Sequence, residues 1–348
     1  LGARMMCAIM RNSDVCGKNF SLKFSLMRGI IRISKVVNVM PEDIIVPDIL
    51  PPSDDGIFKT IMTHPDGEPV LRGVVSDVLN MNFVSVAVRN VEMPISDTRQ
   101  KRQRYDVNCR AVADSGKQID IEMQAEPMGG DNAETGHRNI KSRAIFNLCD
   151  LHAKQPGRGT DYGDYEQSFQ ITFCRYNVFP VSPTRPGFVT RCSFRDEDGI
   201  ELANDVGIIF IELTKLGKVL KKPAKDMTRL KQWCVFFGYA DKPKYRKILD
   251  ELITTREEIG MATNILTSIS KDERERAIFR SRQMYQRDMD HERAVARKEG
   301  RSEGRSEIAR NLLFMGLSTN DIAKATELSV AEIEALRNKG RQDSSAPT

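Results

Sequence analysis

The sequence predicts an α/β protein, in which helices precede and follow a mixed β-sheet and the C-terminal part is helical and charged. Three observations support this prediction. Apolar side chains recur at helical spacing near the start, a series of β-rich or alternating segments follows, and the chain becomes helical from about residue 228. We expect strands over residues 83–91, 104–113, 118–125, 168–175, 188–194 and 206–213. The last segment is continuously apolar, as is typical of a buried central strand.

Two helices are expected before the first strand. The first begins after three N-cap candidates, Ser53, Asp54 and Asp55. A turn at residues 65–67 separates it from a second helix, whose apolar stripe consists of Leu71, Val74, Val75, Val78 and Leu79. A later helix over residues 133–153 has one apolar side, formed by Ile140, Ala144, Ile145, Leu148 and Leu151.

Composition divides the chain into five parts. We expect a disordered or over-extended N-terminus (1–45), an α/β core (46–225), a helical extension (226–270), a charged helix or linker (271–310) and a small helical tail (311–340). An N-terminal helix that docks on the core is the open alternative for the first part. The charged part mixes both signs and lacks the apolar heptads of a coiled coil, so we expect a solvated helix or linker.

Composition and charge exclude several classes of protein. The chain of 348 residues has a net charge of +5, which is compatible with a nucleic-acid partner but does not require one. Its seven cysteines form no CxxC pair, which argues against a disulfide framework or a zinc site and indicates a reducing compartment. The four histidines are not spaced as metal ligands, and no apolar run is long enough to cross a membrane. We therefore expect a cytoplasmic protein.

The most informative segment is RYDVNCRAVADSGKQIDIEMQA, residues 104–125, which alternates like a β-hairpin. A three-residue loop at 114–116, closed by a glycine in the left-handed region, would pair Ala113 with Lys117. In that register Asn108 faces Glu122 and Asp106 faces Gln124, all on the polar side of the hairpin.

This register makes Asp106 and Glu122 diagonal cross-strand neighbours, with β-carbons about 5–8 Å apart. Two carboxylates at that spacing repel each other unless a cation lies between them, and Mg²⁺ prefers such oxygen ligands. The ion could orient a water and stabilise charge on a phosphodiester, while Gln124 positions that water. The alternative is a solvent-exposed polar face without function.

The second strand of this hairpin contains Ile121-Glu122-Met123-Gln124, which resembles the IEMQ signature of the Rpn family of recombination-promoting nucleases, also labelled PD-(D/E)XK family transposases. Other segments are similar to that family in the same order, and the resemblance runs from about residue 51 to 337. The similar segments are Asp55-x-x-Phe58-Lys59, Leu79-Asn80, Tyr105-Asp106-Val107, Arg138 with Arg143, Ile211-Glu212-Leu213-Thr214-Lys215, and the C-terminal tail.

The resemblance implies a restriction-endonuclease-like core and a Mg²⁺-dependent DNA endonuclease that promotes recombination. It implies that Asp106 and Glu122 bind the metal and that Gln124 replaces the usual Lys of the motif. Asp55 would complete the catalytic set, or act only as an N-cap. Substrate contacts are expected from Lys59 near the scissile phosphate and from Arg138 and Arg143. A catalytically inactive DNA-binding or assembly protein with the same fold is the alternative.

Two features depart from the family pattern. Lys141 stands where an aromatic residue is expected, and the long loop from Gln155 to Gln167 leaves Tyr162 and Tyr165 competing for the position of the family's loop tyrosine. Both departures put substrate contacts in doubt, but neither touches the expected metal site.

The tail contains two capping boxes, Ser318-x-x-Asp321 and Ser329-x-x-Glu332, in a helix-turn-helix-like spacing. The acidic second helix, with Glu332 and Glu334, would oppose DNA phosphates. A small tail or an assembly element, through which a homo-oligomer could form, is therefore favoured over a DNA-reading regulator.

Overall fold

The computed structural model describes residues 48–91, 107–113, 116–126, 133–155, 161–180, 187–202 and 204–343. All described residues belong to one unit, Val46–Thr348. The expectations for residues 1–45 therefore lie outside the described residues.

The chain enters the core through α3 (Asp55–Met62) and α4 (Glu68–Leu79), close to the two helices that the sequence predicts. Asp54 is the N-cap of α3, because its carboxylate accepts from the backbone N–H groups of Gly56 (3.0 Å) and Ile57 (3.2 Å). Among the three N-cap candidates it is thus Asp54 that caps the helix, and Asp55 lies in the first turn. Helix α4 ends at Asn80, which adopts a left-handed conformation.

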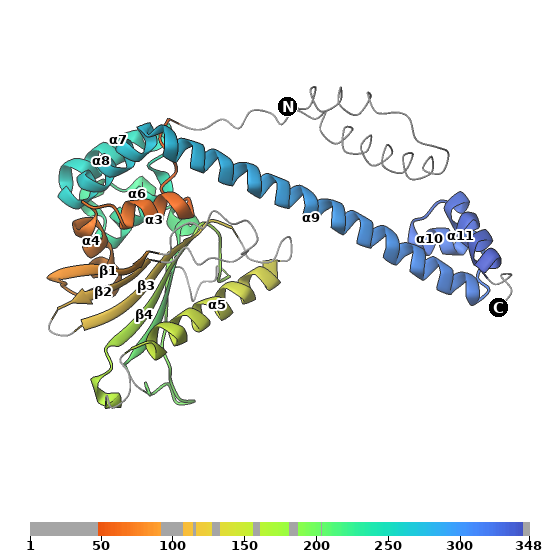
Figure 1. Cartoon of the computed structure of the whole chain (residues 1–348), viewed down its shortest axis with the longest axis horizontal. Helices are drawn as coiled ribbons and strands as arrows, with labels where there is room; N and C mark the ends of the chain where they lie inside the picture. The colour runs from red at the N-terminus through yellow and green to blue at the C-terminus, as the bar shows by residue number, and fades with distance from the viewer. Residues whose placement is uncertain are drawn as a thin grey trace, which may run out of the picture. The chain divides into compact units, whose positions relative to one another are not determined.

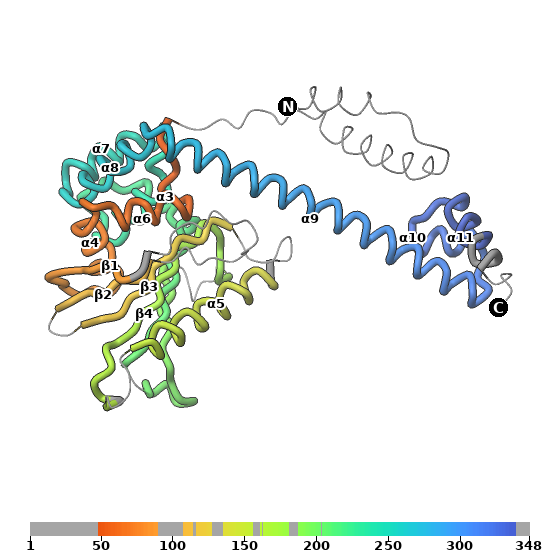
Figure 2. Tube along the Cα trace, in the orientation of Figure 1, coloured from red at the N-terminus to blue at the C-terminus, as the bar shows by residue number. Residues whose placement is uncertain are grey.

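Six strands form one mixed sheet in the order β1-β2-β3-β4-β6-β5. The strands are β1 (Ser85–Val91), β2 (Val107–Val112), β3 (Gly116–Gln124), β4 (Gln167–Cys174), β5 (Val189–Cys192) and β6 (Val206–Glu212). The first three form an antiparallel meander, β3, β4 and β6 are parallel, and β5 pairs antiparallel with β6. Helix α5 (Ala133–Ala153) connects the neighbouring parallel strands β3 and β4 (Figure 2). The predicted mixed sheet with flanking helices is confirmed.

The predicted register of the β2–β3 hairpin is wrong by two residues. Val112 pairs with Gly116, and Asn108 pairs with Asp120 rather than with Glu122. The faces of both strands are nevertheless as predicted, because an even shift preserves the alternation of side chains. Gly116 does not take the left-handed conformation expected of it. It lies inside β3, where a Cβ atom would collide with the side chains of Glu166 and Arg110.

The two faces of the sheet are covered by different helices (Figure 1). The larger core lies against α3, α4, α6 (Arg229–Tyr239), α7 (Arg246–Thr255) and α8 (Glu257–Lys271). Its centre is an aromatic cluster of Phe58, Phe173, Trp233, Phe236 and Phe237.

The other face of the sheet is covered by α5, which contributes Ile140, Ala144 and Leu148 to a second core. Ile145 was predicted on the apolar side of this helix, but its side chain is 51% exposed. Short 3₁₀ helices connect the larger elements: η1 (Tyr162–Asp164), η2 (Leu213–Leu216), η3 (Val219–Lys221), η4 (Ala224–Asp226) and η5 (Pro243–Tyr245).

The charged segment forms one long helix, α9 (Glu273–Phe314), which is followed by α10 (Thr319–Thr326) and α11 (Val330–Asp343). The last two helices pack on α9 around a small core of Ala309, Ile322 and Ile333. The predicted capping box at Ser329 is complete, because Glu332 Oε2 accepts from the Ser329 N–H (2.8 Å) and Ser329 Oγ accepts from the Glu332 N–H (3.3 Å). At the other predicted box Ser318 forms the N-cap, with its Oγ accepting from the Asp321 N–H (3.2 Å), but the Asp321 carboxylate accepts from the Ser318 hydroxyl (2.6 Å) instead of its N–H. Within the described part of the chain, no helix is long and apolar enough to cross a membrane.

Candidate active site

The polar face of β3 is buried, although its alternation was equally compatible with a solvent-exposed face. Gln118, Asp120 and Glu122 are only 5%, 2% and 1% exposed. The reason is the position of the strand, because β3 lies between β2 and β4 while α5 packs over this face of the sheet. Carboxylates that are removed from water in this way require polar or charged partners.

Helix α5 supplies such partners, because its rise matches the spacing along the strand. Two residues of a strand and four residues of a helix both advance by about 6–7 Å. Arg143 contacts Glu122, and Asn147, four residues later on α5, donates to Asp120 Oδ2 at the long distance of 3.4 Å. Helix α5 therefore runs antiparallel to β3 and places a polar side chain opposite each of these two carboxylates.

Four side chains form what we call the Glu122 cluster: Glu122, Gln124, Arg143 and Thr172. Arg143 Nη2 lies 2.7 Å from Glu122 Oε2, and Arg143 Nη1 donates to Gln124 Oε1 at 3.2 Å. The other carboxylate oxygen, Glu122 Oε1, accepts from Thr172 Oγ1 at 3.1 Å. Thr172 lies opposite Glu122 in the parallel β3–β4 ladder. The amide of Gln124 is oriented from its other side as well, because Nε2 donates to the Glu126 carbonyl at 2.9 Å.

The surroundings of the cluster are apolar and partly aromatic. Burial, and to a smaller extent the negative charge of Glu122, raises the pKa of the Cys174 thiol well above its usual range. Burial also raises the pKa of Tyr176, and its hydroxyl has no hydrogen-bond partner among the described residues. His137 of α5 stacks on the Tyr176 ring with centroids 6.4 Å apart. Both Cys174 and Tyr176 are thus held in their neutral forms beside the carboxylate.

Oxygen ligands suited to Mg²⁺ are present in this cluster. The Glu122 carboxylate and the Gln124 carbonyl oxygen approach one cationic group, the guanidinium of Arg143. In the described part of the chain, no three His, Cys, Asp or Glu side chains come close enough to hold a metal. Asp106, the second expected ligand, lies outside the described residues. The described ligands therefore fit a hard cation but amount to one carboxylate and one amide.

The other predicted site residues lie on two helices. Asp55 and Lys59 are on α3, which packs against β3, and Lys59 is only 7% exposed. Arg138 is exposed on α5, five residues before Arg143. The contacts above thus join Arg143, Glu122 and Gln124, whereas the roles assigned to Asp55, Lys59 and Arg138 remain predictions.

Lys141 and Tyr165, at the two departures from the family pattern, each contact a neighbouring ring. Lys141 Nζ lies 4.5 Å from the centre of the Phe179 ring, so a cation–π contact occupies the expected aromatic position. Tyr165 packs edge-on against His152 with ring centroids 5.5 Å apart, near the C-terminal end of α5. Tyr162 begins η1.

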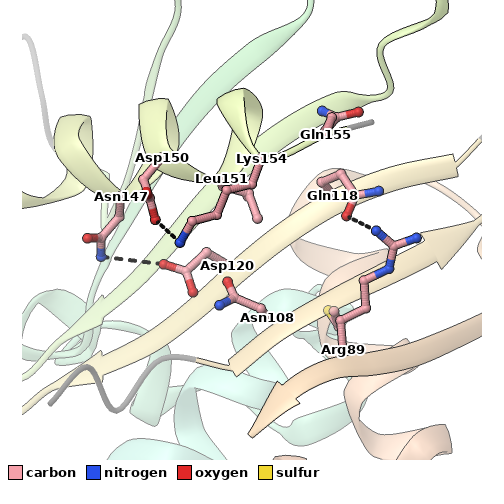
Figure 3. A pocket seen from close by; sticks show the side chains of 10 residues that line it. Arg89, Asn108, Gln118, Asp120, Asn147, Asp150, Leu151, Lys154 and Gln155 are labelled. Atoms are coloured by element: carbon pink, nitrogen blue, oxygen red, sulfur yellow. Dashed lines mark hydrogen bonds and ion pairs between the residues drawn. The ribbon is translucent and has the colours of Figure 1, made fainter. Parts of the chain in front are cut away.

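A polar pocket of about 170 Å³ lies on the same face of β3, next to Asp120 (Figure 3). Asp120 and Asn108 project from neighbouring strands at its floor, and α5 forms one wall. Its walls contain two pairs that are already formed, Arg89 with Gln118 (3.2 Å) and Lys154 with Asp150 (2.7 Å). The pocket extends the polar strip of β3 away from Glu122.

The late Ile211-Glu212-Leu213-Thr214-Lys215 segment forms a second buried charged group, which we call the Glu212 cluster. Glu212 Oε2 pairs with Lys215 Nζ at 2.6 Å, and their side chains are 0% and 7% exposed. Glu212 Oε1 accepts from the backbone N–H groups of Val178 (2.7 Å) and Phe179 (3.1 Å). These contacts fix the segment that follows β4, so the Glu212 cluster is structural.

Sequence reasoning identified Glu122, Gln124 and Arg143 but missed Thr172 and Asn147. The four-residue spacing of Arg143 and Asn147 would have predicted a common helix face. Thr172 could not be found in this way, because only the strand order places β4 beside β3.

Comparison with known proteins gives one match. The profile of a family described as PD-(D/E)XK nuclease family transposase matches residues 52–296, which include the Glu122 and Glu212 clusters. No curated protein matches the chain, and no solved structure matches it.

Proposed function

Because the chain belongs to the PD-(D/E)XK nuclease family transposases, we propose that it is a Mg²⁺-dependent endonuclease that hydrolyses DNA phosphodiesters and promotes recombination. The main supporting observation is Glu122, a carboxylate 1% exposed in the middle of the sheet and joined through Arg143 to Gln124. A buried ion pair contributes little net stability compared with apolar packing. Its presence at the family's IEMQ motif therefore favours a functional role.

In this proposal Glu122 and Asp106 hold Mg²⁺, and Gln124 orients a water through its carbonyl oxygen. The ion, when bound, activates that water and offsets the charge that develops on the phosphodiester. Asp55, at the start of α3, completes the catalytic set. Thr172 holds the Glu122 carboxylate in one orientation through its 3.1 Å hydrogen bond.

We assign DNA contacts to Lys59, Arg138 and Arg143. Lys59 is proposed to lie near the scissile phosphate, and Arg138 is exposed on α5 and can reach a phosphate from solvent. The net charge of +5 is compatible with this substrate. We further propose that the protein acts in the cytoplasm, where DNA is accessible in a bacterium.

The C-terminal helices are proposed as an assembly element for a homo-oligomer. Phe314, the last residue of α9, and Met315, which follows it, are 94% and 71% exposed. Large exposed apolar side chains of this kind are typical of contact surfaces. Light scattering of the Phe314→Ser variant is expected to show a smaller species than the wild type, and equal masses would remove this role.

Cleavage of DNA by purified protein tests the proposed activity. Supercoiled plasmid, linear duplex and single-stranded DNA are incubated with Mg²⁺ or with EDTA. The Glu122→Gln variant keeps the volume of the side chain but loses its charge, so we expect at least about a 100-fold loss of rate. The matched control is Glu197→Gln, which removes an exposed carboxylate in the β5–β6 connection.

The outcomes separate the alternatives. Cleavage that needs Mg²⁺ and Glu122 supports the proposal, and Asp106→Asn is then expected to abolish it as well. Cleavage undiminished in Glu122→Gln would show that the site lies elsewhere. A well-folded wild type that cleaves none of the three DNA forms would favour the catalytically inactive DNA-binding or assembly protein.

A further inference from the structure

Arg143 occupies the carboxylate oxygen proposed to hold the metal and the amide oxygen proposed to orient the water. Its Nη2 lies 2.7 Å from Glu122 Oε2, and its Nη1 lies 3.2 Å from Gln124 Oε1. The planar guanidinium thus bridges a carboxylate and an amide oxygen two residues apart on β3. The fixed, planar arrangement of its N–H donors lets one guanidinium hold both acceptors at once.

The buried position of Glu122 explains why a cation is held there. Its side chain is 1% exposed, and a carboxylate removed from water is costly unless a positive charge neutralises it. Thr172 satisfies the other carboxylate oxygen but carries no charge. Arg143 brings a positive charge to within 2.7 Å of Glu122 Oε2.

Two cations cannot share this position favourably. A divalent ion bound to Glu122 Oε2 would lie within a few ångströms of the guanidinium, where like charges repel strongly in a medium of low dielectric. The Arg143 side chain is 26% exposed, so it can turn toward solvent without breaking the core. Metal and guanidinium are therefore alternative partners of Glu122 Oε2.

We propose that Arg143 is the resident counter-cation of the metal site: it neutralises Glu122 in the metal-free protein and is displaced when the divalent ion binds. The proposal rests on the metal site at Glu122 put forward above. Once displaced, Arg143 is free to contact a DNA phosphate, so the substrate contact assigned to it becomes available only in the metal-bound protein. Arg143 is thus a proposed DNA-contacting residue whose position depends on whether the metal is bound.

The affinity of the protein for a divalent metal tests whether the metal displaces Arg143, and it needs no cleavage assay. Mn²⁺ serves as the probe, because it prefers the same oxygen ligands and its unbound fraction can be counted by electron paramagnetic resonance. The full chain is titrated at pH 8 as wild type and as Arg143→Met, which keeps an extended apolar stem but removes the competing cation. We expect the Kd for Mn²⁺ to fall by on the order of 10- to 100-fold, the strength of a charge-assisted hydrogen bond.

Two further variants separate charge from packing. Thr172→Val removes an uncharged donor from the same carboxylate. Because it changes no charge at the site, its Kd is expected to change less than that of Arg143→Met. Arg143→Lys keeps the charge but has no fork, so its Kd should lie between those of the wild type and Arg143→Met. It also serves as the second test if Arg143→Met fails to fold.

The outcomes distinguish this inference from the proposed function. Mn²⁺ binding that disappears in Glu122→Gln but has the same Kd in wild type, Arg143→Met and Arg143→Lys would overturn the exchange and leave the metal site standing. Equal changes in Thr172→Val and Arg143→Met would also overturn it, because the charge would then be irrelevant. If Glu122→Gln binds Mn²⁺ as well as the wild type does, both proposals fail.

Discussion

Replacing Glu212 with Ala is expected to destabilise the protein strongly, because the change leaves the buried Lys215 ammonium without its carboxylate. The Lys215 side chain is 7% exposed and retains only the Phe179 carbonyl, at 3.1 Å, as a described acceptor. The N–H groups of Val178 and Phe179 also lose their shared acceptor, Glu212 Oε1.

The size of the effect follows from these losses. Breaking a buried ion pair by removal of one partner costs about 3–5 kcal/mol. Each unsatisfied N–H group would add about 1–3 kcal/mol, although water that enters the space left by the side chain can offset this part. We therefore expect the free energy of unfolding to fall by about 3–5 kcal/mol. For a domain of this size the melting temperature should fall by on the order of 6–10 °C.

Urea unfolding followed by circular dichroism measures this loss, with Glu197→Ala as the control at an exposed carboxylate. The control is expected to change stability by less than about 0.5 kcal/mol. A loss in Glu212→Ala no larger than that of the control would refute the structural role of the Glu212 cluster.

A double variant tests the reason for the loss. Glu212→Gln with Lys215→Met removes both charges and keeps an acceptor for the two N–H groups. It should recover most of the stability that Glu212→Ala loses, because no buried charge is left unpaired. The folded double variant should also keep its DNA cleavage, in contrast to Glu122→Gln.

Two other predictions concern carboxylates with shifted pKa values. Burial raises the pKa of the Asp54 carboxyl, so the contribution of Asp54 to the free energy of unfolding decreases as pH rises through that pKa. Asp54→Ala should lose about 1 kcal/mol of N-cap stability at pH 7, whereas Asp54→Asn should not. Equal losses of stability in the two variants, measured by urea unfolding, would contradict this prediction. The hydrogen bond from Arg110 lowers the pKa of Glu166, so its contribution is present above the unfolded pKa of 4.5 and is lost as pH falls through the folded pKa. Glu166→Gln should therefore flatten the acid side of the stability profile below about pH 5. Parallel profiles of the variant and the wild type would show that the pair does not contribute.

Much of the fold follows from local patterns. The strand and helix segments lie close to their predicted ranges, because side-chain periods of two and 3.6 are properties of single segments. The N-caps at Ser318 and Ser329 are correct for the same reason, since each involves residues only three positions apart.

The sequence predicted which β3 residues form the candidate site, but not which side chains surround them. Alternation placed Glu122 and Gln124 on one face of the strand, and the IEMQ pattern indicated the family that the comparison confirms. The same alternation could not fix the register, because a shift by two residues leaves every side chain on its face. Asn108 was consequently assigned to Glu122 instead of Asp120.

The sequence by itself determined the α/β class, the elements, and the faces on which the acidic and amide side chains lie. The tertiary structure decided that β3 is central, that α5 buries its polar face, and that Arg143 and Thr172 are the partners of Glu122. The physical reason is distance along the chain. Periodicity and capping act within a few residues, whereas strand order, register and burial depend on contacts between segments 20 to 50 residues apart, such as Thr172 with Glu122.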